Sequence, residues 1–185
     1  SACWDLCFSA PKSFSIIWGL ASPELRAKLE DLHLRAVRAA IEHLENHYAL
    51  ARTHKDGVKP SDAGFIFAAL TEHSNRADEP HLHTHVQMLN LALWADGSAS
   101  SLFTRNIYQA KMALGALYRT ELSALLQAEL GLSVREHGKS FEIVGVSQKL
   151  IDRFSTRRAE IKQALKDHDA TSSRAAEIAT LATRK

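Results

Sequence analysis

The chain has 185 residues, of which 45% are hydrophobic and 24% are charged, and its formal net charge is +2. This composition is ordinary for a soluble globular protein, and the length suffices for one domain with a sizeable core. The small net charge does not by itself indicate nucleic-acid binding, and no apolar run is long enough to span a membrane. Because nothing resembles a signal peptide, we expect a cytoplasmic protein with no membrane partner.

The first predicted element is a strand over residues 2–9, which contains one acidic residue, Asp5. Asp is depleted in strands, and a buried carboxylate is usually paired or functional, so Asp5 is a candidate site residue. Cys3 and Cys7 share one face of this strand, too far apart along it to form a disulfide. We therefore expect two reduced thiols in the core of a cytosolic protein.

Two helices are predicted next, over residues 12–20 and 23–48. The first begins near Lys12, and its N-terminus can either receive a phosphate or simply be well capped. The second has a Ser-Pro start and apolar residues at helical spacing. His43 and His47 lie four residues apart on it, but nothing else indicates a metal site there, so we interpret them as solvated.

The centre of the chain predicts two strands, over residues 64–73 and 80–94, joined by a polar loop that ends in Pro80. Three histidines alternate with Leu and Thr at the start of the second strand and therefore share one face: His81, His83 and His85. Imidazoles that are adjacent on one face of a strand can chelate one divalent metal ion.

A third ligand for the same ion is available on the preceding strand. If the two strands pair antiparallel, Glu72 or His73 lies opposite the histidine row. These two side chains point to opposite faces, so only one of them can join His83 and His85. Both faces of this strand are apolar, as expected for a strand buried on both sides, so periodicity does not decide between them. The alternative is a His-rich surface strand that binds metal only adventitiously.

In the second half of the chain, Asp96-Gly97 predicts a hairpin turn, followed by a short strand to residue 103 and a helix over residues 104–130. A hairpin over residues 132–144 and a helix from Ser147 to about residue 168 are predicted next. This order predicts an α+β fold, with a mostly antiparallel sheet and helices packed on one face. We expect a core domain over residues 1–169 and a helical extension or linker over residues 170–185.

Two motifs bring the predicted site together: Asp5-Leu6-Cys7-Phe8-Ser9-Ala10-Pro11-Lys12-Ser13, and Arg76 followed by Asp78-Glu79-Pro80-His81-Leu82-His83-Thr84-His85. Through them the chain resembles the conjugative relaxases of the MobF (TraI/TrwC) class, which are HUH endonucleases. The similarity continues through residues 114–119, 141–143, 154–158 and 181–185, so it covers nearly the whole chain. It implies the palm-like sheet of that superfamily.

The resemblance implies the chemistry of a DNA nickase. A tyrosine attacks one phosphodiester of single-stranded DNA at a plasmid transfer origin, forms a 5′-phosphotyrosyl link and frees a 3′-hydroxyl. A divalent cation (Mg²⁺, Mn²⁺ or Zn²⁺), held by a histidine cluster, polarises the phosphate. His83 and His85 match two family ligands, and Asp5 matches an aspartate that helps to activate the tyrosine or to orient a ligand. The implied partners are single-stranded and hairpin DNA of the origin and other relaxosome proteins, in the bacterial cytoplasm.

The chain departs from the family pattern at the nucleophile. The family's nucleophilic tyrosines lie upstream of the Asp5 strand, and this sequence contains no such segment. Its own tyrosines all fall on predicted helices, and we assign none of them as nucleophile: Tyr48, Tyr108 and Tyr118. We therefore expect this chain alone to be inactive in cleavage.

A second departure concerns the third metal ligand. An ungapped match places Glu72 where the family has a histidine, with His73 next to it. We therefore expect Glu72 to be the third ligand, although a bulge at the strand end can still bring His73 inward.

Two basic residues are expected to contact DNA. Arg76 lies in the loop beside the histidine strand and Lys12 opens a helix near Asp5, so both can neutralise phosphates of a bound strand; the alternative is ordinary solvated charge.

Two other functions are consistent with parts of the sequence. One is a DNA-binding module that holds origin DNA without nicking it. The other is a two-His-one-carboxylate iron oxygenase that uses Glu72, His83 and His85. Such oxygenase sites usually lie in all-β barrels, and the long helices argue against that fold.

Overall fold

The computed structural model describes residues 2–48, 50–53, 57–60, 64–103, 105–156, 158–160 and 163. The predicted C-terminal extension, residues 170–185, lies outside the described residues.

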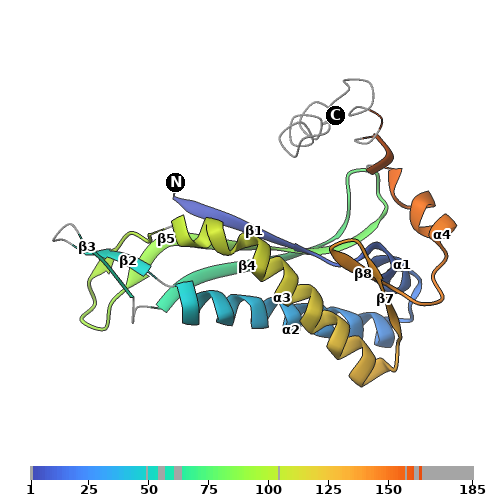
Figure 1. Ribbon diagram of the computed structural model, residues 1–185, viewed down its shortest axis with the longest axis horizontal. Helices are drawn as coiled ribbons and strands as arrows, with labels where there is room; N and C mark the ends of the chain where they lie inside the picture. Colours follow the sequence, from blue (N-terminus) through green and yellow to red (C-terminus); the bar gives the residue numbers. More distant parts are fainter. Residues whose placement is uncertain are drawn as a thin grey trace.

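An antiparallel sheet with strand order β1-β5-β4 forms the centre of the fold, and a short strand, β6, adds to the far end of β5. The bounds are Cys3–Ser9 for β1, Gly64–Ser74 for β4, Pro80–Leu93 for β5 and Ala99–Ser100 for β6. Figure 1 shows the two long central strands, β4 and β5, beside the N-terminal strand. The predicted antiparallel pairing of the two central strands is confirmed.

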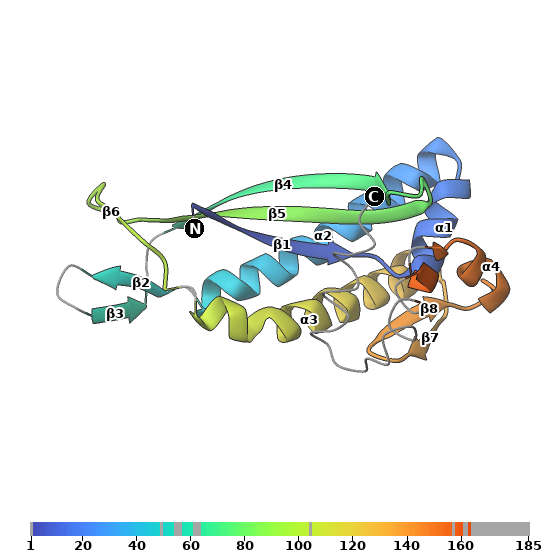
Figure 2. The same cartoon turned by 90° about the horizontal axis from the view of Figure 1, so that it is seen from above.

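Two long helices, α2 (Pro23–Tyr48) and α3 (Arg105–Leu130), pack on one face of the sheet, and the shorter α1 (Lys12–Leu20) lies near the start of β5 (Figures 1 and 2). The sequence dictates this arrangement because both long helices carry an apolar stripe at a spacing of three or four residues. On α2 the buried stripe includes Leu29, Leu32, Ala36, Ala40 and Leu44, and on α3 it includes Ile107, Leu114, Leu122 and Leu126. Each buried Leu or Ile contributes about 1.5–3 kcal/mol. The predicted α+β fold is confirmed.

The other face of the sheet carries no helix among the described residues, and its side chains are partly exposed. Ile66 and Leu70 on β4 are 37% and 53% exposed, and Leu89 on β5 is 41% exposed. The prediction that the Glu72 strand is buried on both faces is therefore wrong, and this surface is called the open face below. Cys3 and Cys7 lie on the same open face and are exposed, so the prediction of core thiols is also wrong.

Two small hairpins complete the fold. The strands β2 (Leu50–Thr53) and β3 (Gly57–Pro60) pair with each other. The strands β7 (Val134–His137) and β8 (Ser140–Ile143) form the hairpin that the sequence predicted.

The last predicted helix ends earlier than expected. Ser147 caps it as predicted, accepting a bond from the Leu150 amide, but α4 covers only Gln148–Arg153. Three residues beyond its end, the Thr156 amide donates to the Glu79 carboxylate at 2.9 Å. Residues 156, 158–160 and 163 are again helical.

The N-terminus of α1 is occupied from within the chain. The Ser13 amide donates to the carboxylate of Glu142 on β8 at 2.8 Å, and the Ser13 hydroxyl accepts from the Ile143 amide at 2.8 Å. Glu142 is 5% exposed, so a buried carboxylate takes the place that the sequence offered to a phosphate. Within the part of the chain that the structure describes, no helix is both long and apolar enough to cross a membrane.

Candidate metal centre

Three side chains from two neighbouring strands meet on the open face: Glu72 at the end of β4, and His83 and His85 on β5. One ligand atom from each residue lies within 4.8 Å of the others. The register explains this grouping, because Glu72 lies directly opposite His83 and Leu70 lies opposite His85. Residues two apart on a strand share a face, so both imidazoles point to the same side as the carboxylate.

Each imidazole of this group is held through its Nδ1 atom. The Nδ1–H of His83 donates to the backbone carbonyl of His81 at 2.8 Å. The Nδ1–H of His85 donates to the carboxylate of Asp5 at 2.8 Å. In a neutral imidazole with a protonated Nδ1, the free lone pair is on Nε2. His83 Nε2 lies 3.4 Å from a carboxylate oxygen of Glu72, and a ligand atom of His85 lies within 4.8 Å of both residues, so these three side chains fit a divalent cation.

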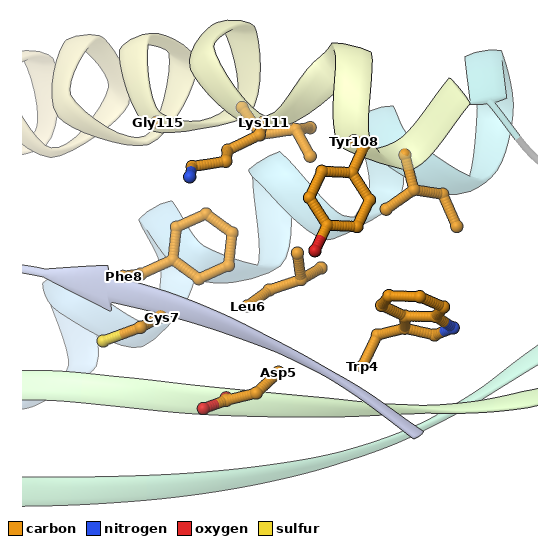
Figure 3. Close-up of a pocket in the computed structure, with 10 residues that line it drawn as sticks. Trp4, Asp5, Leu6, Cys7, Phe8, Tyr108, Lys111 and Gly115 are labelled. Carbon is orange, nitrogen blue, oxygen red and sulfur yellow. The ribbon is translucent and has the colours of Figure 1, made fainter. Parts of the chain in front are cut away.

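Asp5 belongs to this centre as a partner of His85. Its side chain is 50% exposed, so the expectation of a buried strand carboxylate is wrong, but the carboxylate is paired. Figure 3 shows Asp5 on the side of β1 away from α3, whereas Leu6 and Phe8 point towards that helix. The alternation of the strand therefore places Asp5 on the open face, beside the histidines.

His73 lies on the helix side of β4, and the structure does not bring it into the group. Its ring stacks on the Trp18 ring, with centroids 4.8 Å apart and an interplanar angle of 3°. Its Nε2 lies 3.4 Å from the carboxylate of Glu30, which also accepts a hydrogen bond from the Trp18 indole at 2.8 Å. These contacts hold the ring against α1 and α2.

His81 lies next to the group without forming part of it. Its ring centroid is 4.7 Å from that of His83, as expected for neighbouring positions on one face. Burial lowers the pKa of His81 to about 4, so its ring is neutral at pH 7.

The two predicted DNA contacts differ in their surroundings. Arg76 is exposed in the turn between β4 and β5. Lys12 is half-buried, and its ammonium donates to the Pro80 carbonyl at 3.0 Å. Burial lowers the pKa of Lys12 from its usual value.

Glu72, His83 and His85 are called the metal group from here on. A buried polar chain lies on the inner face of the sheet, on the opposite side from the metal group, and we did not predict it from the sequence. His33 on α2 contacts the Tyr118 hydroxyl through Nδ1 and the Thr84 hydroxyl through Nε2, both at 2.8 Å. The Thr84 and Thr71 hydroxyls lie 3.0 Å apart. The signal was present, because His33 follows Leu29 by four residues and so falls within the apolar stripe of α2.

The chain is thus an α+β domain whose antiparallel sheet carries a candidate metal site on its open face: two alternating histidines, a glutamate and a supporting aspartate. The family model described as TrwC relaxase matches residues 1–185, and the chain belongs to this family. This confirms the resemblance that the two sequence motifs indicated.

Two curated relatives match nearly the whole chain. The multifunctional conjugation protein TraI of Escherichia coli K12 is 31% identical over 98% of this chain, and a second E. coli TraI is 30% identical over the same share. The chain spans about a tenth of the length of these curated relatives.

Solved structures of TrwC also match. One, complexed with a 27-mer DNA that comprises the recognition hairpin and the cleavage site, superposes with a TM-score of 0.87 at 28% identity and covers 98% of this chain and 65% of that chain. Structures of the conjugative relaxase TrwC with oriT DNA, metal-free and metal-bound, give TM-scores of 0.88 and 0.86, each at 28% identity over 98% of this chain; they are covered to 65% and 63%.

Proposed function

We propose that this chain is the metal-binding core of a relaxase that nicks one DNA strand at a plasmid transfer origin during conjugation and transfers that strand. The observation that carries the proposal is the Glu72, His83 and His85 group, supported by Asp5, in a chain of the TrwC relaxase family. The TrwC structures in complex with oriT DNA support the choice of substrate.

The residues of the open face have separate roles in this proposal. Glu72, His83 and His85 hold the cation, and Asp5 fixes the orientation of the His85 ring through its Nδ1. When bound, the cation withdraws electron density from the scissile phosphate. In the reaction the tyrosine hydroxyl gives up its proton as its oxygen bonds to phosphorus, and the bond between phosphorus and the 3′ oxygen breaks. The leaving 3′ oxygen takes up one proton and becomes a hydroxyl, so no net proton is consumed, and the 5′ phosphate stays on the protein.

We propose Mn²⁺ or Mg²⁺ as the preferred ion, ahead of Zn²⁺. A Glu in place of a third imidazole makes the site less positive and adds a hard oxygen ligand, which favours harder ions.

The nucleophile is not assigned to this chain. Tyr48 lies on α2 and Tyr108 and Tyr118 lie on α3, and both helices pack on the face of the sheet opposite the metal group. A tyrosine that attacks a phosphate at the group must come from a segment that approaches the open face.

The two alternative functions fare differently. The Glu72, His83 and His85 group has the composition of an oxygenase site, but the α+β fold and the TrwC relaxase family argue against an oxygenase. A binding module without nicking is separated from a relaxase by experiment.

The test uses the full-length protein and a labelled single-stranded oligonucleotide of its own transfer origin, with Mn²⁺ or Mg²⁺ and with a chelator. We expect a nick that depends on the metal and leaves the 5′ product attached to protein. His85→Gln and Asp5→Asn should reduce nicking, whereas His43→Gln, an equivalent change on α2, should not. DNA binding without cleavage under all metal conditions would support the binding module instead.

A further inference from the structure

A chain of four buried or half-buried polar side chains connects both long helices to the strands that carry the metal group. It runs from Tyr118 on α3 to His33 on α2, then to Thr84 on β5 and Thr71 on β4, with contacts of 2.8, 2.8 and 3.0 Å. Tyr118, His33 and Thr84 are at most 1% exposed. Burying this many polar groups is costly unless every bond is made, so an apolar core would have been the simpler solution.

The position of this chain relative to the metal group is specific. Thr84 lies between His83 and His85 on β5, and Thr71 precedes Glu72 on β4. Thr71 and Thr84 are cross-strand partners, and the next pair along the ladder is Glu72 with His83. The polar chain therefore holds Thr71 and Thr84 on the inner face of the sheet. Their neighbours in sequence, Glu72, His83 and His85, form the metal group on the open face.

The hydrogen bonds of the chain have a preferred direction. If His33 Nδ1 carried the proton, the Tyr118 hydroxyl would accept it, and no other acceptor for the hydroxyl proton is found among the described residues. If Tyr118 donates to Nδ1, then Nε2–H donates to Thr84 and Thr84 donates to Thr71, so every bond is made. Burial lowers the pKa of His33 to about 4, which keeps the ring neutral, as this direction requires.

We propose that Tyr118 and His33 are positioning residues of the metal centre, which act through Thr84 and Thr71 to fix the spacing of Glu72, His83 and His85. This inference rests on the proposed function, because it assumes that the group binds a cation. A ladder that shifts by a fraction of an ångström would separate the carboxylate from the imidazoles, since they come from different strands.

The test measures Mn²⁺ affinity by calorimetry and the electron paramagnetic resonance spectrum of bound Mn²⁺. Thr84→Val removes the hydroxyl but keeps the branched shape, and it should weaken Mn²⁺ binding by about tenfold, the low end of the effect of partners outside the ligand shell. Tyr118→Phe removes a hydroxyl that is two hydrogen bonds further along the chain than Thr84. It should change the Mn²⁺ affinity and the spectrum in the same direction as Thr84→Val, but by a smaller amount. Thr84→Ser keeps the hydroxyl and should restore both.

A matched control separates positioning from general stability. Leu126→Val, in the buried stripe of the same helix and outside the polar chain, should lower stability without changing the Mn²⁺ affinity or the spectrum. Unchanged binding in both Thr84→Val and Tyr118→Phe would overturn the inference, and so would an equal loss in Leu126→Val. If the unmodified chain does not bind Mn²⁺ at all, the proposed function fails with it; if it binds and the variants match it, only the inference fails.

Discussion

At the residue scale, the choice between Glu72 and His73 illustrates what a strand decides. The two are neighbours in sequence, yet one faces His83 and the other stacks on Trp18. The apolar pattern of β4 left this choice open, because small and aliphatic residues occur on both of its faces. Two facts decide it: the register of β4 with β5, and the contacts that Trp18 and Glu30 offer to His73 on the helix side of the sheet. Neither can be deduced from the local sequence.

The two residues should therefore differ in metal binding. Glu72→Gln removes a charged ligand and should weaken Mn²⁺ binding by at least about tenfold, whereas His73→Gln should leave the affinity close to that of the unmodified chain. Calorimetric titration with Mn²⁺ measures both. A loss confined to His73→Gln would show that a bulge turns His73 into the site and that Glu72 is not the ligand.

His33 should make stability depend on pH. Its pKa in the folded chain is about 4, against an ordinary value near 6.5, because burial disfavours the charged ring and His83 and His73 add positive charge nearby. Between these pH values the His33 imidazole is protonated in the unfolded chain but stays neutral in the folded chain. The free energy of unfolding therefore falls as the pH is lowered from 6.5 to 4. The full effect is about 3 kcal/mol.

The measurement is urea unfolding at pH 7 and at about pH 4.5. His33→Gln should lose less stability between the two pH values than the unmodified chain does. The pKa of His81 is lowered in the same direction, also chiefly by burial, so His81→Gln is the matched variant and should likewise reduce the pH dependence of stability. An identical pH dependence in His33→Gln and the unmodified chain would contradict the assignment.

At the element scale, the elements with local signals were predicted well from the sequence. Periodicity and turn residues correctly placed three features: the histidine strand, the loop that ends at Pro80, and the apolar stripes of α2 and α3. The misses have long-range causes. α4 ends early where Thr156 donates to Glu79, 77 residues away, and nothing near Thr156 signals that bond.

The open face is a second miss at this scale. Alternation indicates that a strand has two faces, but it does not reveal that, among the described residues, helices cover only one of them. Cys3, Cys7 and Leu70 are apolar enough to suggest a core, and they are exposed because α2 and α3 both pack on the opposite side.

The β7–β8 hairpin should stabilise α1 through one charge. Glu142→Gln keeps an acceptor for the Ser13 amide but removes the negative charge from the helix N-terminus, which should cost about 1–2 kcal/mol of unfolding free energy. Urea denaturation measures the loss. Glu136→Gln, an exposed change on the same hairpin, is the control and should cost little. Equal effects of the two changes would show that the charge at α1 contributes nothing.

At the scale of the whole molecule, the two long helices, α2 and α3, and the metal group lie on opposite sides of the sheet, and this separation predicts what the chain alone can do. All three of its tyrosines lie on the helices. The chain should therefore bind single-stranded origin DNA but form no covalent adduct with it. Denaturing electrophoresis of a mixture with labelled oligonucleotide and Mn²⁺ tests this. An adduct that resists denaturation, and that is lost in Tyr108→Phe or Tyr48→Phe, would contradict it.

Arg76 and Lys12 lie near the same end of the sheet, where the β4–β5 turn meets the start of α1, and both should contribute to DNA binding through phosphates. Arg76 is exposed in that turn, so Arg76→Ala should lower the salt dependence of single-strand binding by about 0.7 in the slope of log K against log salt. Lys12→Ala should act in the same direction. Its ammonium also bonds to the Pro80 carbonyl, so its variant should lose stability as well, whereas Arg76→Ala should not.

Fluorescence anisotropy with a labelled single strand, measured at several salt concentrations, gives the slopes. Lys149→Ala, a change of a basic residue on α4, serves as the control and should leave the slope unchanged. The slope separates a phosphate contact from a structural effect, because a variant that merely unfolds part of the chain loses active protein without changing how the remainder responds to salt. Unchanged affinity and slope in both Arg76→Ala and Lys12→Ala would show that these cations are only solvated surface charges.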